Sequence, residues 1–278
     1  MDYVRSKVSG SIGFIILNRP EKRNALNPQL VDELSILMEE FNRNDKIRVV
    51  VLKSSDKNFC AGADLSYIKA LNDFSFEENL ADSNRLKQMF ELVYNSPKIT
   101  ISQVEGPAIA GGCGLAQMTD FCFATDNATF GYSEVKIGFI PALVMVYLRE
   151  KIGMNLLNKW LLTGSIFNAQ NAYEDGLVYK VVSSDIIDSI VVDFAENIAK
   201  NTSPESIKLT KSLMREIPSN RLEALELAAR SNALARQTAD CKKGVLSFLN
   251  KQKIKWGITR IHIVIYTATI FRKILKVL

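Results

Sequence analysis

Two short segments carry residue types that suit chemistry at a carbonyl group. FCAGADL (Phe59–Leu65) and GPAIAGGCG (Gly106–Gly114) are both rich in glycine and alanine. Small residues let a backbone N–H come close to a ligand, and two separate turns can aim one N–H each at a single oxygen. Together the two segments fit an oxyanion hole, in which such donors stabilise negative charge on that oxygen.

A third segment supplies a carboxylate. Glu134 lies among apolar residues in FGYSEVKIGFIP (Phe130–Pro141). Such surroundings should raise the pKa of the carboxyl group, which suits proton transfer. Taken alone, this segment would favour a surface glutamate paired with Lys136. Each glycine-rich segment, taken alone, is more often a tight turn or a place of close packing than a catalytic feature.

Other catalytic chemistries are disfavoured by composition. The only histidine is His262, near the C-terminus, so no imidazole is available to a Ser-His-Asp or Cys-His relay in the first 261 residues. The four cysteines show no CxxC pair and no histidine at metal-ligand spacing. We therefore expect no metal site, and reduced core thiols.

The charge balance argues against nucleic acid as a partner. Four of the 35 lysines and arginines fall within the last 22 residues, which leaves 31 cations against 30 acids over residues 1–256. A net charge near +1 does not indicate the basic surface that a nucleic-acid-binding protein needs. The N-terminus shows no export or organelle signal, so a cytoplasmic location is expected.

Apolar and β-branched runs predict the elements that hold these segments. Ile47–Lys53 and Ile99–Val104 are predicted as buried strands that precede the two glycine-rich segments. A helix is predicted over Asn27–Asn44, with Asn27 as N-cap and Pro28 at the first helical position. The other elements expected are strands at Ser11–Leu17 and Phe121–Ala124 and a helix at Asp185–Lys200.

The alternation of strands and helices predicts an α/β fold with crossover connections. From Ser203 onward strand signals vanish, and helical patterns at Ser206–Arg215 and Leu222–Leu234 are separated by Pro218. We therefore expect a core over residues 1–202, a helical region over 203–256 and a tail over 257–278.

In this order and spacing the motifs resemble the crotonase (enoyl-CoA hydratase/isomerase) superfamily. The resemblance runs through residues 1–256, and its further motifs are NRPEKRNALN (Asn18–Asn27), ATFGYSEVKIGFIP (Ala128–Pro141), LLTG (Leu161–Gly164) and AYEDGLVYKVV (Ala172–Val182). It implies a core of repeated ββα spiral turns and a helical C-terminal region that forms a homotrimer, commonly a dimer of trimers. It implies an acyl-CoA substrate and no separate cofactor, since coenzyme A is part of the substrate.

Carried onto this sequence, the family pattern makes Ala63 and Gly111 the donors of two backbone N–H groups to the thioester oxygen. Glu134 becomes the acid/base, and the family's shared intermediate is an enolate. The substrate-binding residues that the resemblance implies are Lys22, Ala25, Ala61, Gly62, Asp64, Leu65 and Gly114.

Gly114 is where the sequence departs from the family pattern. Hydratases that act on simple enoyl chains usually carry a second glutamate at this position. With Glu134 alone, a hydratase, a Δ3,Δ2-enoyl-CoA isomerase and an acyl-CoA decarboxylase are all open, because each can use the same oxyanion hole. A catalytically silent binding protein is the competing class, and the presence of Glu134 argues against it.

The combination AGGCGL with GYSEVKIGFIPALV resembles bacterial 3-methylglutaconyl-CoA and isohexenylglutaconyl-CoA hydratases. Their substrates carry an extra carboxylate and belong to leucine or acyclic terpene breakdown. We therefore expect a hydratase for a branched, carboxylated acyl-CoA, in which the substrate's carboxylate or a basic residue that receives it rebalances a site with one glutamate.

The tail, Gly257–Leu278, extends beyond the usual family length. Only 11 residues lie between Arg260 and Arg272, too few to span roughly 30 Å of hydrocarbon as a helix. Contact with a membrane surface or a partner is the functional alternative. An extension without a catalytic role is favoured over it.

Overall fold

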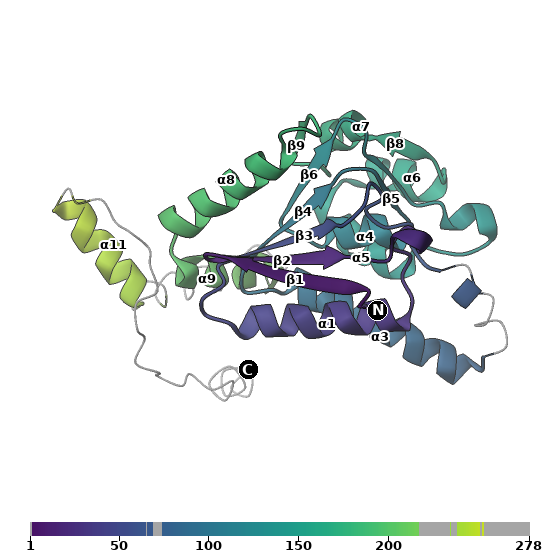
Figure 1. Cartoon of the computed structure of the whole chain (residues 1–278), viewed down its shortest axis with the longest axis horizontal. Coiled ribbons are helices and arrows are strands. Elements are labelled where there is room, and N and C mark those ends of the chain that lie inside the picture. Colours follow the sequence, from purple (N-terminus) through teal and green to yellow (C-terminus); the bar gives the residue numbers. More distant parts are fainter. Residues whose placement is uncertain are drawn as a thin grey trace.

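A six-stranded sheet forms the centre of the protein, whose computed structural model describes residues 2–64, 66–68, 74–216, 234, 238–250 and 252. The strand order is β1-β2-β3-β4-β6-β9, and every neighbouring pair is parallel except β1 with β2 (Figure 1). The strands of this sheet are β1 (Val4–Ser9), β2 (Ile12–Leu17), β3 (Val49–Ser54), β4 (Ile99–Val104), β6 (Phe121–Thr125) and β9 (Lys180–Val182).

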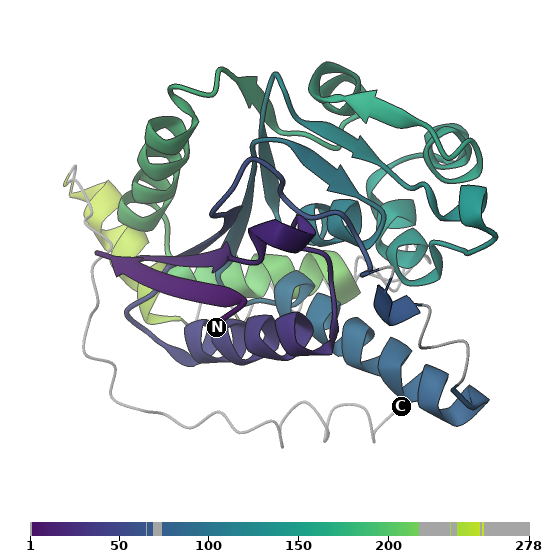
Figure 2. The ribbon, with the colours of Figure 1, turned by 45° about the vertical axis from the view of Figure 1, so that its right-hand side comes forward.

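Helices cover both faces of the sheet. α1 and α3 lie on one face and α8 on the other (Figures 1 and 2). The described helices are α1 (Pro28–Arg43), α3 (Phe76–Tyr94), α4 (Gly111–Gln117), α5 (Ala142–Lys151), α6 (Met154–Leu162), α7 (Ala169–Glu174), α8 (Ile187–Asn201), α9 (Pro204–Glu216) and α11 (Ala239–Leu249), with 3-10 turns η1 (Pro20–Lys22) and η2 (Glu134–Ile137).

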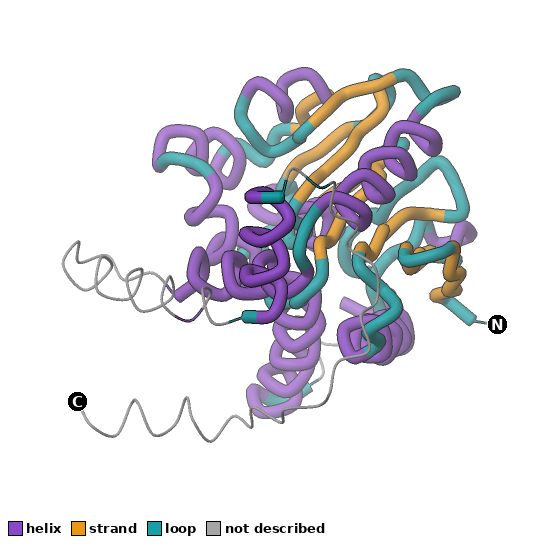
Figure 3. Tube along the Cα trace, turned by 90° about the vertical axis from the view of Figure 1, so that its left-hand side faces the viewer, coloured by secondary structure: helices purple, strands orange, loops and turns teal. Residues whose placement is uncertain are grey.

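Alternation along β3 explains why both faces are apolar. Val50 and Leu52 pack into the core under α1 and α3, while Val49 and Val51 pack toward α8. Successive side chains of a strand point to opposite faces, so a parallel strand with helices on both sides must be apolar throughout. Figure 3 shows this sandwich of strands between helices.

A second, three-stranded sheet positions the chemistry. It consists of β5 (Pro107–Ile109), β7 (Thr129–Gly131) and β8 (Ile166–Asn168), with β5 and β7 parallel and β7 and β8 antiparallel. Because β5 and β7 run side by side in the same direction, the residues that follow them emerge at one edge. Gly111 follows β5 and Glu134 follows β7.

The predicted α/β class and its main elements are confirmed. β4 has the predicted bounds, and Asn27 caps α1 by accepting the N–H of Leu30 at 3.0 Å. The helix predicted from Asp185 begins two residues later. β1 and α3 were not predicted. β5, β7 and β8 were not predicted either, because a strand of three residues is too short to leave a periodic pattern in the sequence.

The C-terminal region is helical where the structure describes it. α9 is tied to the core by an ion pair between Lys211 and Asp120, and burial lowers the pKa of Lys211 to about 8 against the opposing charge of Asp120. The pattern at Leu222–Leu234, except Leu234 itself, and the tail lie outside the described residues. The division into three segments stays a prediction. Among the helices described, none is long and apolar enough to cross a membrane.

Candidate active site

One cavity brings together the three segments that the sequence picks out. It has a volume of about 570 Å³ and lies between α3, the loop after β3 and the stretch that leads from η2 into α5. Ala61, Ala63, Gly111 and Glu134 all line it. Gly62 and Gly114 do not line it themselves, but a Cβ on either of them would contact residues that do.

The loop after β3 is fixed by backbone hydrogen bonds. Cys60 donates its N–H to the carbonyl oxygen of Pro107 at 3.1 Å and accepts that of Ile109 at 2.9 Å, which makes a parallel bridge to β5. Ala61 donates to the carbonyl oxygen of Arg23 at 3.0 Å. The loop is therefore held from two sides, and its N–H groups have fixed directions.

Ala63 sits in a second parallel bridge, with Leu26. Leu26 donates to the carbonyl oxygen of Gly62 at 2.7 Å, and Asp64 donates to that of Leu26 at 2.9 Å. The N–H of the next residue, Asp64, is engaged in this way, whereas that of Ala63 has no acceptor among the hydrogen bonds of the described residues. A free N–H on a cavity wall is what an oxyanion requires.

Gly111 presents a second N–H that has no acceptor among the hydrogen bonds of the described residues. It is the first residue of α4, so its N–H has no partner within the helix. The preceding Ala110 is held at φ 53°, ψ −126° by donating to the carbonyl oxygen of Gly131 at 2.7 Å. This conformation is costly for a residue with a Cβ and sets the direction of the Gly111 N–H.

Glycines let the two N–H donors come together. A Cβ on Gly62, whose φ is +83°, would lie 2.8 Å from the Ala110 Cβ and 3.4 Å from the Gly111 nitrogen. A Cβ on Gly112 would lie 2.2 Å from the carbonyl oxygen of Cys60. Neither glycine can gain a side chain without separating the two turns.

Glu134 begins η2 and contributes its side chain to the lining of the same cavity. It is 8% exposed, and its Oε2 has no hydrogen-bond partner within the described structure. Burial raises the pKa of Glu134, and a backbone hydrogen bond opposes the shift without cancelling it. No described ion pair joins it to Lys136, which is exposed, so the surface-pair alternative does not hold.

The position of Gly114 is walled by apolar side chains. A Cβ there would lie 2.2 Å from Val144 Cγ1 and 3.6 Å from Phe90 Cζ. Val144 comes from α5 and Phe90 from α3, and both line the cavity. A glutamate at position 114 would therefore need Val144 to move. The packing of Val144 against Gly114 leaves no room for a second carboxylate at this position.

The remaining sequence-predicted residues lie around the loop. Lys22 is exposed at the end of η1, and the Ala25 carbonyl accepts from Arg19 Nη1 at 2.9 Å. Asp64 pairs with Arg19 Nη2 at 2.7 Å, both side chains being 8% exposed. Burial opposes ionisation of Asp64, but the hydrogen bonds from Arg19 and Ser66 hold its pKa below the usual value. Leu65 lies outside the described residues.

Sequence reasoning missed Arg19 and Asn24, which hold the loop in place. Asn24, at φ 54°, accepts the N–H of Arg19 at 2.7 Å. Its amide donates to the carbonyl oxygens of Asn58 at 2.9 Å and Phe59 at 3.1 Å. Asparagine tolerates a positive φ. That property was the available signal within the NRPEKRNALN motif.

The α3 wall of the cavity was also missed. Tyr67 donates its hydroxyl to Asp82 at 2.6 Å across this wall. The signal was present, because Ser75 and Glu78 have the spacing of a capping box, and the structure contains that box. No group of His, Cys, Asp and Glu suited to a metal ion occurs in the part of the chain described.

Comparison with known proteins agrees with this geometry. The family model described as enoyl-CoA hydratase/isomerase matches residues 7–258. A Thermus thermophilus protein named for enoyl-CoA hydratase activity is 38% identical over 244 residues, which are 87% of this chain and 96% of that protein. A crotonyl-CoA hydratase of Syntrophomonas wolfei is 30% identical, with 87% of this chain and 93% of that relative covered.

Solved structures show the same fold. The crystal structure of an enoyl-CoA hydratase from Shewanella pealeana superposes with a TM-score of 0.86 at 29% identity, and the match covers 91% of this chain and 96% of that one. The three segments, their shared cavity and these likenesses lead to one conclusion: the chain has the crotonase fold and belongs to the enoyl-CoA hydratase/isomerase family.

Proposed function

We propose that the protein is an enoyl-CoA hydratase that adds water across the 2,3 double bond of an acyl-CoA. The observation that carries this proposal is that two free backbone N–H groups and one buried carboxyl group line the same cavity. Ala63 and Gly111 have N–H groups without acceptors, and Glu134 is a buried carboxyl group with an unpartnered oxygen. Coenzyme A belongs to the substrate, so no separate cofactor is required.

In the proposed reaction the two N–H groups donate to the thioester oxygen. Water attacks carbon three, and the electron pair of the double bond moves through carbon two to the oxygen, which gives an enolate. Glu134 takes a proton from the attacking water and returns a proton to carbon two. Losing one donor of such a hole typically costs about 2.7–4 kcal/mol of transition-state stabilisation.

We propose a branched, carboxylated acyl group, such as that of 3-methylglutaconyl-CoA, as the substrate class. Support comes from Gly114, because Val144 fills the place where a second carboxylate would stand. A substrate with its own carboxylate can restore the missing polar contact. Leucine or acyclic terpene breakdown is the metabolic setting that such a substrate implies.

The second candidate is a Δ3,Δ2-enoyl-CoA isomerase. The observation that favours it is the apolar wall of Val144 and Phe90 beside Gly114, which offers water no hydrogen bond. Moving a proton between carbons two and four needs only one base. A decarboxylase would use the oxyanion hole without demanding a second carboxylate.

Product mass distinguishes these reactions. The purified protein is incubated with 3-methylglutaconyl-CoA, and the product is followed by mass spectrometry. The proposal predicts a gain of one water. A positional isomer of unchanged mass, or a loss of carbon dioxide, would replace the hydratase by one of its alternatives.

The other proposals concern binding and assembly. We propose that substrate contacts are made by Lys22, Ala25, Ala61, Gly62, Asp64, Leu65 and Gly114. We further propose a cytoplasmic homotrimer, or a dimer of trimers, assembled through residues 203–256. Light scattering of the purified protein would test the assembly, with a monomer as the contradicting result.

A further inference from the structure

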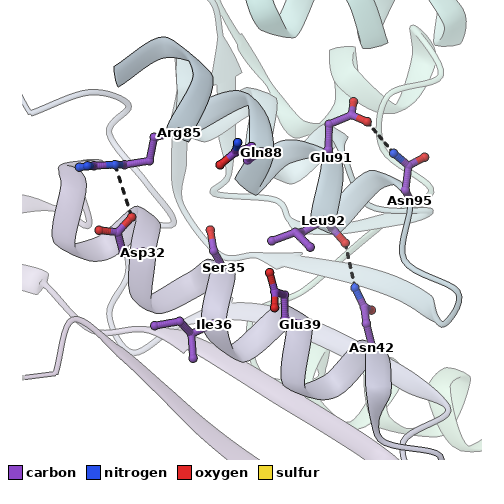
Figure 4. A pocket seen from close by; sticks show the side chains of 10 residues that line it. All are labelled: Asp32, Ser35, Ile36, Glu39, Asn42, Arg85, Gln88, Glu91, Leu92 and Asn95. Carbon is purple, nitrogen blue, oxygen red and sulfur yellow. Dashed lines mark hydrogen bonds and ion pairs between the residues drawn. The ribbon is translucent and has the colours of Figure 1, made fainter. Parts of the chain in front are cut away.

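Helix α3 borders the active-site cavity with one face and a surface groove with another, and Arg85 lies where these two faces meet. Its cavity face carries Asn79, Asp82, Ser83, Leu86 and Phe90. Its other face borders a surface groove against α1 and carries Arg85, Gln88, Glu91 and Leu92, and Asn95 follows directly after the helix (Figure 4). Arg85 lines both hollows. It is also the only cation among the described residues that line the active-site cavity.

The cavity changes from apolar to polar along α3. Phe90 lies beside Gly114 at the reacting end, and Leu86 follows one turn away. At a rise of about 1.5 Å per residue, the backbone of Arg85 lies about 7.5 Å along the helix axis from that of Phe90, and the backbone of Asp82 about 12 Å from it. An acyl group that lies along α3 from the Gly114 end therefore passes an apolar stretch before it meets charged and polar groups.

Two carboxylates near Arg85 leave most of its guanidinium group uncommitted. Asp32 on α1 lies 3.5 Å from Nε, an ion pair whose side chains are 46% and 55% exposed (Figure 4). An ion pair between side chains as exposed as these holds Arg85 only weakly. Asp82 accepts a hydrogen bond from the hydroxyl group of Tyr67. The two terminal nitrogens of Arg85 have no acceptor among the described ion pairs and side-chain hydrogen bonds.

We propose that Arg85 binds a carboxylate at the far end of the acyl group and so selects for carboxylated acyl-CoA substrates. Its terminal nitrogens form the planar fork that matches a carboxylate through two parallel hydrogen bonds. The Asp32 pair engages only Nε and leaves both terminal nitrogens available to a substrate carboxylate. This inference rests on the proposed chemistry at Glu134 and adds to it the residue that recognises the substrate's second charge.

The test compares two enoyl-CoA substrates of equal chain length, one ending in a carboxylate and one ending in a methyl group. The wild-type protein should prefer the carboxylated substrate. Arg85→Met should lower the ratio of the two kcat/KM values about tenfold, mainly through KM, because a hydrogen bond to a charged group is lost. Arg43→Met is the matched control, since Arg43 forms an exposed ion pair on α1 outside the cavity.

Two further variants separate recognition from structure. Arg85→Lys keeps the charge without the fork and should fall between wild type and Arg85→Met. Asp32→Asn frees Arg85 and should raise the preference for the carboxylated substrate. A preference that is equal in wild type and Arg85→Met, or a loss in Asp32→Asn as large as in Arg85→Met, would overturn the inference. Failure to turn over either substrate would instead defeat the proposed function.

Discussion

The two walls of the active-site cavity differ in the groups that they present: one presents backbone groups and the other presents side chains. The wall that carries Ala63 and Gly111, the backbone wall, offers backbone N–H groups, and its geometry is fixed by backbone hydrogen bonds and by glycines with no room for a Cβ. The other part of the lining, the side-chain wall, comes from η2, α3 and α5 and offers side chains, among them Glu134, Val144 and Arg85. A backbone wall stabilises one charge whatever the acyl chain, whereas a side-chain wall can differ between relatives.

The largest expected effect comes from the one carboxylate of the reacting end. Glu134→Gln should lower kcat by about 10²–10⁴-fold, because positioned proton transfer contributes on that order. Steady-state kinetics on the preferred substrate measures it. Glu196→Gln, in an exposed ion pair on α8, is the control for the same substitution. Equal turnover in Glu134→Gln and wild type would remove Glu134 from the mechanism and favour a silent binding protein.

The backbone wall can be tested by pushing its two turns apart. Gly112→Ala places a Cβ 2.2 Å from the Cys60 carbonyl oxygen, so both N–H donors should shift. We expect kcat to fall about 10²-fold, as for one lost donor, and stability to fall by about 1–3 kcal/mol, as for an overpacked site.

Kinetics and urea unfolding of the same variant measure the two effects. Gly153→Ala is the matched control, because nothing lies within 4 Å of a Cβ there. Full activity in a stably folded Gly112→Ala protein would show that donor placement is not critical. Gly111→Pro also removes a donor, but it is a less clean probe. Proline disfavours the conformation that Ala110 adopts before it.

The apolar part of the side-chain wall should control the choice of reaction. Gly114→Glu combined with Val144→Ala restores a second carboxylate and removes the Cγ1 that would block it. We expect the ratio of hydration to isomerisation to rise about tenfold, which corresponds to about 1.4 kcal/mol. Product analysis measures the ratio, with Val144→Ala alone as the control. An unchanged ratio would show that a second carboxylate at this position does not govern the outcome.

The smallest effect concerns stability as a function of pH. Burial raises the pKa of Glu134 in the folded protein, so the folded state binds a proton more tightly than the unfolded state. Wild-type stability should therefore fall, relative to Glu134→Gln, as pH rises from the unfolded value of about 4.5 through the folded pKa. Melting temperatures of both proteins between pH 4 and 8 measure the difference. A constant difference across this range would contradict the raised pKa.

The sequence predicts the backbone wall better than the side-chain wall, for a physical reason. The strands before each glycine-rich turn and the cap at Asn27 are local patterns, and the structure contains them. The burial of Glu134 was predicted from its apolar neighbours in sequence, but Ile137 and Phe139 are exposed at the cavity. Its raised pKa results from the inward direction of its side chain.

Contacts between distant segments could not be predicted. Val144 reaches Gly114 from 30 positions away in the chain, and Arg85 meets Asp32 between two helices. Neither contact leaves a periodic signal in the sequence, because each depends on how α3, α5 and α1 pack. The residues that set specificity are therefore the ones that need the structure.

Exchange of a substrate proton with solvent tests the central claim most directly. The saturated analogue of the preferred substrate, which cannot be hydrated, is incubated with the protein in deuterated water, and deuterium at carbon two is followed by NMR. If the backbone wall stabilises an enolate and Glu134 moves its proton, wild type should catalyse exchange and Glu134→Gln should be at least about 10²-fold slower. Equal exchange rates in the two proteins would contradict the account.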